Sequence, residues 1–313
     1  MSRIHEALKK AEQERAASQG GPQPVYSGNE IPESSTVSIV DELRPESAMH
    51  SGVPYTSAMP PLTSALSLET LLARCLPQAW APDEKTMLFF NDEDSSRGTE
   101  EFRTLRSRLY HAREKMPLKK LLVTSALPKE GKSFTAANLA QVLVRQHGRR
   151  ALLIDADLRS PRLHMMLGTT SSPGLADYLQ GRGDEFSGMQ RGPMENLFLI
   201  PSGGEISDPS ELVANGRLKL LLQRVENLFD WIIIDSPPTI PVSDASVLAK
   251  ACDGVLMVVR SDATPTDMAR RARQEFPDEM LVGVVLNGTH AETVPYSRYY
   301  YDANQKNGNE SKA

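Results

Sequence analysis

The feature that most constrains this chain is a polar loop between an apolar run and an alanine-rich segment. The apolar run is residues 121–123, and the loop, residues 125–133, reads Ser-Ala-Leu-Pro-Lys-Glu-Gly-Lys-Ser. A helical pattern then begins at Phe134. A strand leading through a loop that ends in Gly-Lys-Ser into a helix is typical of a P-loop. The loop N–H groups and the helix N-terminus would offer positive charge to phosphate oxygens. This stretch predicts a nucleotide site.

Individual residues of the loop suggest particular roles. Lys132 would place a full charge at the β- and γ-phosphates, and the Ser133 hydroxyl would be a ligand for Mg²⁺. Ala126 stands where the motif has its first glycine, and its methyl group is tolerable only if the residue avoids positive φ. The alternative is an ordinary strand–helix loop that happens to contain Gly-Lys-Ser.

The composition of the chain limits its size class, its partners and its cellular location. The 313 residues suffice for one large α/β domain with extensions, and a net charge of −5 gives no broad electrostatic case for nucleic acid. The two cysteines, Cys75 and Cys252, match neither a metal nor a disulfide spacing. No apolar run approaches the roughly 20 residues that span a bilayer, and the start of the chain lacks the layout of a signal peptide. We expect a soluble cytoplasmic protein without a direct membrane span.

The chain divides into four predicted parts. Residues 1–17 form a short helix with a narrow apolar stripe, and residues 18–86 form a disordered linker rich in Pro, Ser and Gly. Within that linker, residues 62–76 can form a short amphipathic helix. The predicted nucleotide-binding domain covers residues 87–290, and a flexible, tyrosine-bearing tail covers residues 291–313.

Apolar runs alternate with helical patterns throughout the predicted domain. This favours an α/β fold: a doubly wound, mainly parallel sheet of the P-loop NTPase type with helices on both faces, preceded by a largely disordered extension. Ligands of such a sheet gather at the carboxyl ends of its strands. The expected strands lie in residues 121–123, 150–157, 196–201, 230–238, 254–260 and 281–287.

Three aspartates follow two of these expected strands. Asp155 and Asp157 end one strand, and Asp235 ends another after an apolar run. Phosphoryl transfer needs carboxylates that hold Mg²⁺ and that position or deprotonate the incoming hydroxyl. The alternative for any one of them is a helix cap or a turn residue.

A charged helix is expected at the start of the predicted domain. Thr99 can cap it, and its inward face would be Phe102, Leu105 and Leu109. Its other side carries three charged residues at a spacing of three, which could pair with one another or with a neighbour, or could form a solvated face. These residues are Glu100, Arg103 and Arg106.

The combination of motifs resembles the bacterial tyrosine kinases that regulate exopolysaccharide and capsule synthesis. Residues 125–133, 153–164 and 232–238 are similar to the three Walker segments of that family. The Glu-x-x-Arg-x-x-Arg motif resembles the one through which its kinase domains assemble into rings, and residues 296–301 resemble its autophosphorylated tyrosine cluster. Residues 2–11 also resemble the subgroup encoded with exosortase-type exopolysaccharide loci.

The resemblance implies ATP and Mg²⁺ as cofactors and assigns roles to residues. The catalytic set is Lys132, Asp155, Asp157 and Asp235, with Asp155 the candidate to take the tyrosine proton. Ser133, Asp157 and Asp235 would hold Mg²⁺, and Asn287 would read adenine. The implied ATP-binding residues are Ala126, Lys129, Glu130, Gly131, Lys132, Ser133, Phe134 and Asn287. The implied phosphate acceptors, modified in trans, are Tyr296, Tyr299, Tyr300 and Tyr301.

The resemblance also implies partners. We expect a ring-like homo-oligomer, a separate membrane-anchored activator of the chain-length-determinant type, and a phosphotyrosine phosphatase. The kinase would be cytoplasmic and recruited to the inner face of the cell membrane through its activator. No nucleic-acid partner is expected.

Two other functions share parts of this pattern. A partition- or septum-positioning-type ATPase has the same fold and Walker segments, but it relies on a signature lysine where this chain has Leu127. A nucleotide-gated scaffold of a polysaccharide export complex would need fewer carboxylates. Neither alternative gives the tyrosine tail an acceptor role.

Overall fold

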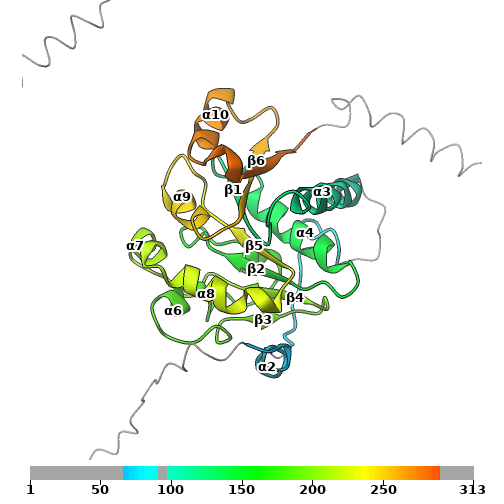
Figure 1. Ribbon diagram of the computed structural model, residues 1–313, viewed down its shortest axis with the longest axis vertical. Helices are drawn as coiled ribbons and strands as arrows, with labels where there is room; N and C mark the ends of the chain where they lie inside the picture. Colours follow the sequence, from blue (N-terminus) through cyan, green and yellow to red (C-terminus); the bar gives the residue numbers. More distant parts are fainter. Residues whose placement is uncertain (1–65, 76, 91–96, 290–313) are drawn as a thin grey trace, which may run out of the picture. The chain divides into compact units, whose positions relative to one another are not determined.

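A seven-stranded sheet is the centre of the computed structural model, which describes residues 66–75, 77–90 and 97–289 (Figure 1). The strand order is β3-β4-β2-β5-β1-β6-β7. All neighbours pair in parallel except β3, which is antiparallel to β4. The strands are β1 (Lys120–Ser125), β2 (Ala151–Asp155), β3 (Gln190–Arg191), β4 (Leu197–Ile200), β5 (Trp231–Asp235), β6 (Gly254–Arg260) and β7 (Leu281–Asn287).

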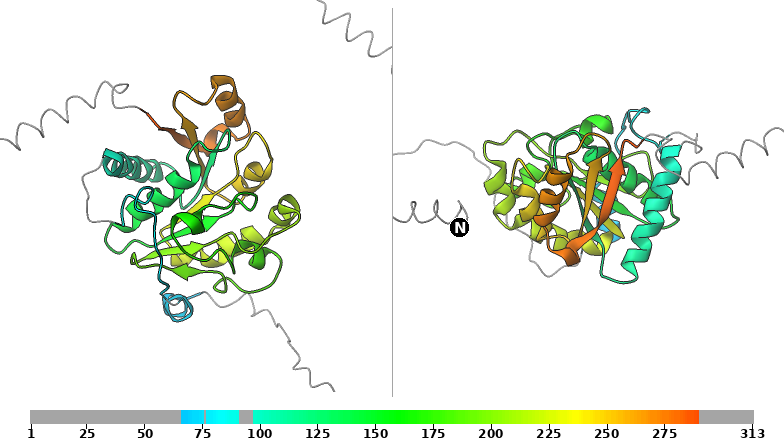
Figure 2. Two further views of the ribbon diagram at one scale, coloured as in Figure 1. Left: turned by 180° about the vertical axis from the view of Figure 1, so that it is seen from behind. Right: turned by 90° about the horizontal axis from the view of Figure 1, so that it is seen from above.

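Helices connect these strands and cover the sheet on both faces (Figure 2). The longer ones are α3 (Arg97–Arg113), α4 (Lys132–Val144), α8 (Arg217–Val225) and α10 (Thr266–Gln274). The shorter ones are α2 (Leu68–Arg74), α5 (Leu163–Met166), α6 (Leu175–Leu179), α7 (Pro209–Ala214) and α9 (Asp244–Ala249), with 3₁₀ turns η1 (Glu226–Leu228) and η2 (Asp278–Met280).

Alternate residues of the central strands supply two cores. Leu121 and Val123 of β1 face α3 and α4, whereas Leu122 faces the layer that includes α6, α8 and α9. Because successive strand residues point to opposite faces, a strand buried on both sides reads as a continuous apolar run. This arrangement confirms the predicted doubly wound, mainly parallel fold.

The six expected strands are all present, and β3 was not expected. It has two residues and no apolar run, so no periodicity marks it in the sequence. The predicted cap of α3 is wrong, since the helix begins at Arg97 and Thr99 lies inside it, buried. The inward positions are right for Phe102 and Leu109, which are buried.

The predicted linker, residues 18–86, extends too far toward the C-terminus. Helix α2 buries Leu71 completely, and the following segment, residues 77–90, packs along the domain. We call residues 77–90 the strap. The Asn138 side chain of α4 accepts a hydrogen bond from Leu88 N–H at 2.8 Å, and Gln141 accepts one from Phe89 N–H at 3.3 Å. The folded part therefore includes residues that composition alone assigns to disorder. Residues 1–65, with the predicted N-terminal helix, lie outside the described ranges.

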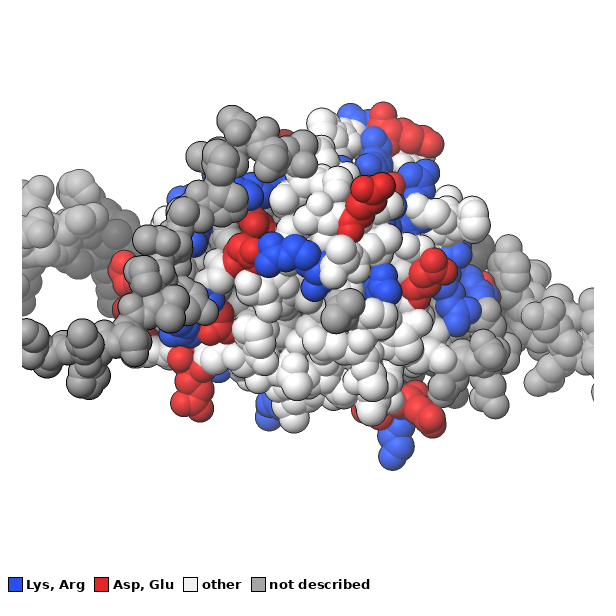
Figure 3. All heavy atoms as spheres, turned by 90° about the horizontal axis from the view of Figure 1, so that it is seen from below, with Lys and Arg blue, Asp and Glu red and all other residues white. Residues whose placement is uncertain are grey.

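Charged side chains on the face shown in Figure 3 are interspersed, with uncharged side chains between them. Acidic and basic groups of the described residues alternate there, so this face presents no extended basic patch of the kind that binds nucleic acid. Among the helices described, none combines the length and apolar character required to cross a bilayer.

Candidate nucleotide-binding and phosphoryl-transfer site

The loop between β1 and α4 meets the one backbone condition that its sequence set, which concerns Ala126. Ala126 is buried against Met257 and Ala272, and its φ is not positive, so its methyl group is compatible with the loop. Lys129 has φ 67° and Gly131 has φ 97°. A Cβ on Gly131 would lie 2.0 Å from Asn287 Nδ2, so a side chain here would displace the Asn287 amide as well as strain the backbone.

Helix α4 begins directly at the end of this loop. Gly131 precedes the helix as its N-cap residue, and its carbonyl accepts the Thr135 N–H at 2.8 Å. Lys132 and Ser133 form the first turn, where unpaired N–H groups and the helix dipole favour an anion. Both residues are buried, at 8% exposure each. The first turn thus presents a cation and a hydroxyl at the carboxyl edge of the sheet.

Parallel pairing of neighbouring strands gathers the three predicted aspartates beside this turn. Strand β5 lies between β1 and β2, and its register places Asp235 opposite Asp155. The Lys132 ammonium lies 2.6 Å from Asp157 Oδ2, 3.7 Å from Asp235 Oδ1 and 3.2 Å from Ser133 Oγ. The four predicted catalytic residues therefore meet in one buried cluster.

Burial and the electrostatic interactions among its charged groups shift the pKa values of this cluster. Burial, reinforced by Asp235, raises the pKa of Asp155 to about 8, against the N–H of Leu163 and the charge of Lys132. Burial also raises the pKa of Asp235 to about 6, opposed by Lys132 and the nearby Ser133 hydroxyl. For Lys132, burial disfavours the charge, but Asp235 and Asp157 outweigh it and raise its pKa. The lysine is therefore charged and neutralises part of the carboxylate cluster.

Asp155 and Asp157 also organise the segment that follows β2. Asp155 Oδ2 accepts the N–H groups of Arg162 and Leu163 at 3.1 and 3.0 Å, and Asp157 Oδ1 accepts that of Ser160 at 3.0 Å. The second oxygen of Asp155 is buried and has no hydrogen-bond partner within the described residues. Asp155 thus combines a structural contact on one oxygen with a free acceptor on the other.

The donor set fits a nucleotide-bound Mg²⁺. Both oxygens of Asp235 are buried and accept no hydrogen bond of normal geometry from the described part of the chain. Hydroxyl and carboxylate oxygens are ligands that Mg²⁺ prefers, usually together with substrate phosphates and waters. Over the described ranges, no group of three His, Cys, Asp or Glu residues is placed to hold a metal alone. Ser133, Asp157 and Asp235 therefore suit a metal that is shared with phosphates.

A cavity of about 560 Å³ adjoins the start of α4. Phe134 and Asn287, both predicted to bind ATP, lie on its wall together with Phe102 and Leu105 of α3. Phe134 also makes an edge contact with Phe102, at 5.8 Å between ring centroids. The lining also includes Glu101, Arg108 and three threonines, so the cavity combines an apolar, aromatic part with polar groups, as sites for flat heterocycles do.

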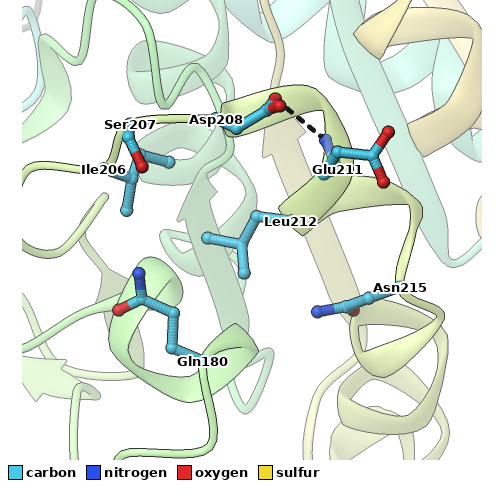
Figure 4. A pocket seen from close by; sticks show the side chains of 7 residues that line it. All are labelled: Gln180, Ile206, Ser207, Asp208, Glu211, Leu212 and Asn215. Atoms are coloured by element: carbon cyan, nitrogen blue, oxygen red, sulfur yellow. Dashed lines mark hydrogen bonds between the residues drawn. The ribbon is translucent and has the colours of Figure 1, made fainter.

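A second, smaller cavity of about 250 Å³ lies beside α7 (Figure 4). Asp208 there accepts the Glu211 N–H at 3.3 Å, as the cap of α7. None of the predicted site residues lines this cavity. The candidate site is therefore the cluster at the carboxyl ends of β1, β2 and β5.

The remaining predicted residues lie apart from this cluster. Glu100 and Arg103 form an ion pair on α3, and Arg106 donates to the Val142 carbonyl of α4 at 3.0 Å. Arg106 therefore ties α3 to α4 within one chain. The predicted acceptor tyrosines fall beyond residue 289, outside the described residues.

Several residues that shape the site were not anticipated. Arg260 at the end of β6 and Thr264 in the β6–α10 connection contact the loop, and Asn138 and Gln141 hold the strap on α4. For the two amides a signal exists: they are polar residues in a helix that is otherwise mostly small and apolar, and both are completely buried. Thr264 carries no such local signal.

Comparisons with known proteins identify relatives of this chain. A family model described as "AAA domain" matches residues 129–267. The tyrosine-protein kinase YwqD of Bacillus subtilis is 33% identical over 217 residues, which cover 69% of this chain and 90% of that protein. The tyrosine-protein kinase wzc of Salmonella typhimurium is 33% identical over 204 residues, 64% of this chain but only 28% of the length of wzc.

A solved structure supports the same assignment. The kinase domain of the Escherichia coli tyrosine kinase ETK is 29% identical, with a TM-score of 0.59 over 66% of this chain and 83% of that domain. This chain thus matches nearly the full length of YwqD. It also contains the phosphate loop, the buried lysine and the three aspartates. The chain belongs to the bacterial tyrosine kinase family.

Proposed function

We propose that this chain is an ATP-dependent protein-tyrosine autokinase that transfers the γ-phosphoryl group to tyrosines of its own C-terminal tail, in the service of exopolysaccharide synthesis or export. The observation that carries the proposal is the buried cluster of Lys132 with Asp155, Asp157 and Asp235 at the end of a phosphate loop. Phosphoryl transfer depends mainly on positioning and charge stabilisation, and this cluster supplies both.

Each residue of the cluster has a distinct task. The loop N–H groups and Lys132 hold the phosphates, while Ser133, Asp157 and Asp235 hold the metal and its waters. Mg²⁺, when bound, neutralises charge that develops on the transferred group. The free oxygen of Asp155 takes the proton of the incoming tyrosine. Its raised pKa of about 8 lies closer to that of tyrosine, about 10, than an ordinary carboxyl does.

The base of the nucleotide would occupy the cavity beside α4. Asn287 stands at its edge, next to Gly131, and Phe134 and Phe102 form part of its apolar wall. An amide that reads the edge of adenine and aromatic side chains that contact its face would together select the nucleotide.

Phosphotyrosine mapping by mass spectrometry tests the activity. The full chain is incubated with Mg·ATP, alone and with a candidate activator, beside Lys132→Met. We expect phosphate on Tyr296, Tyr299, Tyr300 or Tyr301 in the wild type and none in the variant. ATP hydrolysis with an unmodified tail would instead indicate a positioning-type ATPase. Nucleotide binding without any turnover, even with activator, would indicate a nucleotide-gated scaffold.

A mixing experiment tests transfer in trans. A chain truncated after residue 289 serves as the kinase, and the full-length Lys132→Met chain serves as the acceptor. Phosphorylation of the acceptor would establish transfer between chains. An unmodified acceptor, beside a wild-type chain that modifies itself, would establish transfer within one chain.

The assembly is proposed on the same basis. A ring-like homo-oligomer through Glu100, Arg103 and Arg106, a membrane-anchored activator of the chain-length-determinant type and a phosphotyrosine phosphatase would place the kinase at the inner face of the cell membrane. Residues 2–11 would mark the exosortase-associated subgroup. Unchanged membrane recruitment and phosphorylation after deletion of residues 1–60 would argue against a tethering role of the extension.

A further inference from the structure

We propose that Glu130 is a positioning residue of the phosphate loop, which keeps the loop N–H groups directed toward the phosphates through hydrogen bonds and not through its charge. The inference rests on the proposed nucleotide site. It assigns Glu130 a role different from direct contact with ATP. It also gives Thr264, a residue outside the Walker segments, a part in nucleotide binding.

The Glu130 carboxylate is engaged on both oxygens. It is 3% exposed, and Oε2 accepts the Leu127 N–H at 2.7 Å across the loop. Oε1 contacts the Thr264 hydroxyl of the β6–α10 connection. The Arg260 N–H donates to Thr264 Oγ1 at 3.1 Å, so the hydroxyl proton is available for Glu130. The Glu130 side chain therefore joins the start of the loop to Thr264, which lies 134 positions after Glu130 in the sequence.

The carbonyl groups of the same turn are held from outside the loop. Arg260 Nη1 donates to the Lys129 carbonyl at 3.3 Å, and Asn287 Nδ2 donates to the Glu130 carbonyl at 2.9 Å. In a trans peptide the N–H points opposite to the C=O. The N–H groups of Glu130 and Gly131 therefore point away from Arg260 and Asn287, which leaves them for an anion on the inner side of the loop.

This turn needs support because of its backbone. Lys129 is not glycine, and its left-handed φ of 67° is a strained conformation for such a residue. Glu130 lies between Lys129 and Gly131, so the two hydrogen bonds of its side chain hold the two peptide groups that flank it in place. Without these bonds we expect the loop to relax and the N–H groups to lose their common direction.

The negative charge of Glu130 does not explain why an acid occupies this position. A carboxylate in a phosphate-binding loop repels the ligand. Glutamine can make the same two contacts, with its oxygen accepting from Leu127 and its amide donating to Thr264 Oγ1. The hydrogen-bond explanation thus predicts that glutamine replaces glutamate well, whereas a role that needs the charge predicts that it fails.

The experiment measures dissociation constants of the full chain for ATP, ADP and adenosine, in EDTA and with Mg²⁺. We expect Glu130→Ala to weaken ATP and ADP binding about tenfold, or about 1.4 kcal/mol, and to leave adenosine binding unchanged. Glu130→Gln should bind ATP at least as tightly as the wild type. Thr264→Val should weaken ATP binding severalfold, whereas Thr264→Ser, which keeps the hydroxyl, should bind ATP like the wild type. Glu275→Ala, an exposed glutamate that ends α10, is the matched control.

The coupling of the two residues gives a second measurement. Because Thr264 acts through Glu130, the Glu130→Ala/Thr264→Val double variant should bind ATP no worse than Glu130→Ala alone. Three results would overturn the inference: Glu130→Gln as weak as Glu130→Ala, unchanged ATP binding in Glu130→Ala, or an equal loss of adenosine binding. A wild-type chain that binds no ATP would overturn the proposed function itself.

Discussion

Replacing Lys132 with methionine should destabilise the nucleotide-free protein, and the effect should depend on pH. The ammonium lies 2.6 Å from Asp157 and 3.7 Å from Asp235, with all three side chains at most 9% exposed. Removing one partner of a buried ion pair costs about 3–5 kcal/mol, because the other charges stay buried without compensation. We expect a loss of that size in the free energy of unfolding at pH 8.

The loss should shrink at lower pH. Lys132 lowers the pKa values of Asp155 and Asp235, so its removal lets both rise above about 8 and about 6. A carboxyl group with a raised pKa binds a proton in the folded state that the unfolded state has released, so stability falls as pH rises toward that pKa. If the folded variant holds one proton more than the folded wild type throughout pH 5.5–8, each pH unit changes the difference in stability by about 1.4 kcal/mol. About 3 kcal/mol of the loss is then recovered at pH 5.5.

Urea unfolding in EDTA at pH 5.5, 7 and 8, followed by circular dichroism, measures these differences. Lys219→Met replaces an exposed lysine of α8 and is the control for loss of a charge. Adding Asp157→Asn to the Lys132→Met chain should recover part of the stability, because it removes one of the stranded charges. A loss below about 1 kcal/mol at pH 8, or the same loss at every pH, would refute the view of Lys132 as the counter-ion of the cluster.

Three further predictions follow from single contacts. Asp155→Asn should keep the contacts to the segment after β2 and lower the rate of tail phosphorylation about 10²- to 10⁴-fold. In the wild type this rate should rise with pH through about 8, because Asp155 loses its proton there. A flat pH profile in single-turnover assays would count against Asp155 as the base. Gly131→Ala should weaken ATP binding about 5- to 150-fold in equilibrium titrations, because it adds strain of about 1–3 kcal/mol at φ 97° and displaces Asn287; ATP binding like that of the wild type would contradict this. Asn138→Leu should lower the free energy of unfolding by about 2 kcal/mol, because the Leu88 N–H and the Thr86 carbonyl lose their buried partner, and proteolysis within the strap should become faster; a strap as resistant as the wild type would show that the amide does not hold it.

The central sheet and the meeting of Lys132 with the three aspartates could be predicted because their signals are local. The run Ile232–Ile234 is apolar at every position because β5 is buried on both faces, and the aspartate that follows must then lie at the carboxyl edge of the sheet. Lys132 is fixed to the same edge by the strand–loop–helix order. Once both statements hold, the meeting of the lysine and the aspartates follows from parallel pairing alone.

The residues that brace the site could not be predicted, because their partners are distant in the sequence. Nothing near Thr264 distinguishes it from a residue that caps a helix, and only the adjacency of β1 and β6 in the sheet brings it to Glu130. The strap is a similar case. Trp80 packs so closely on Gly192 that a Cβ there would lie 2.3 Å from its ring, yet the surrounding sequence has the composition of a linker.

The strap is hydrogen-bonded to the helix that begins at the candidate nucleotide site. It is held on α4 by Asn138 and Gln141, two buried amides on the helix whose first turn carries Lys132 and Ser133. Asn138 also donates to the Phe134 carbonyl at 3.0 Å, so the contact with the strap reaches the first turns of the helix directly. A polar contact buried in this way is costly to leave half made, so the strap and the start of α4 should keep or lose their order together.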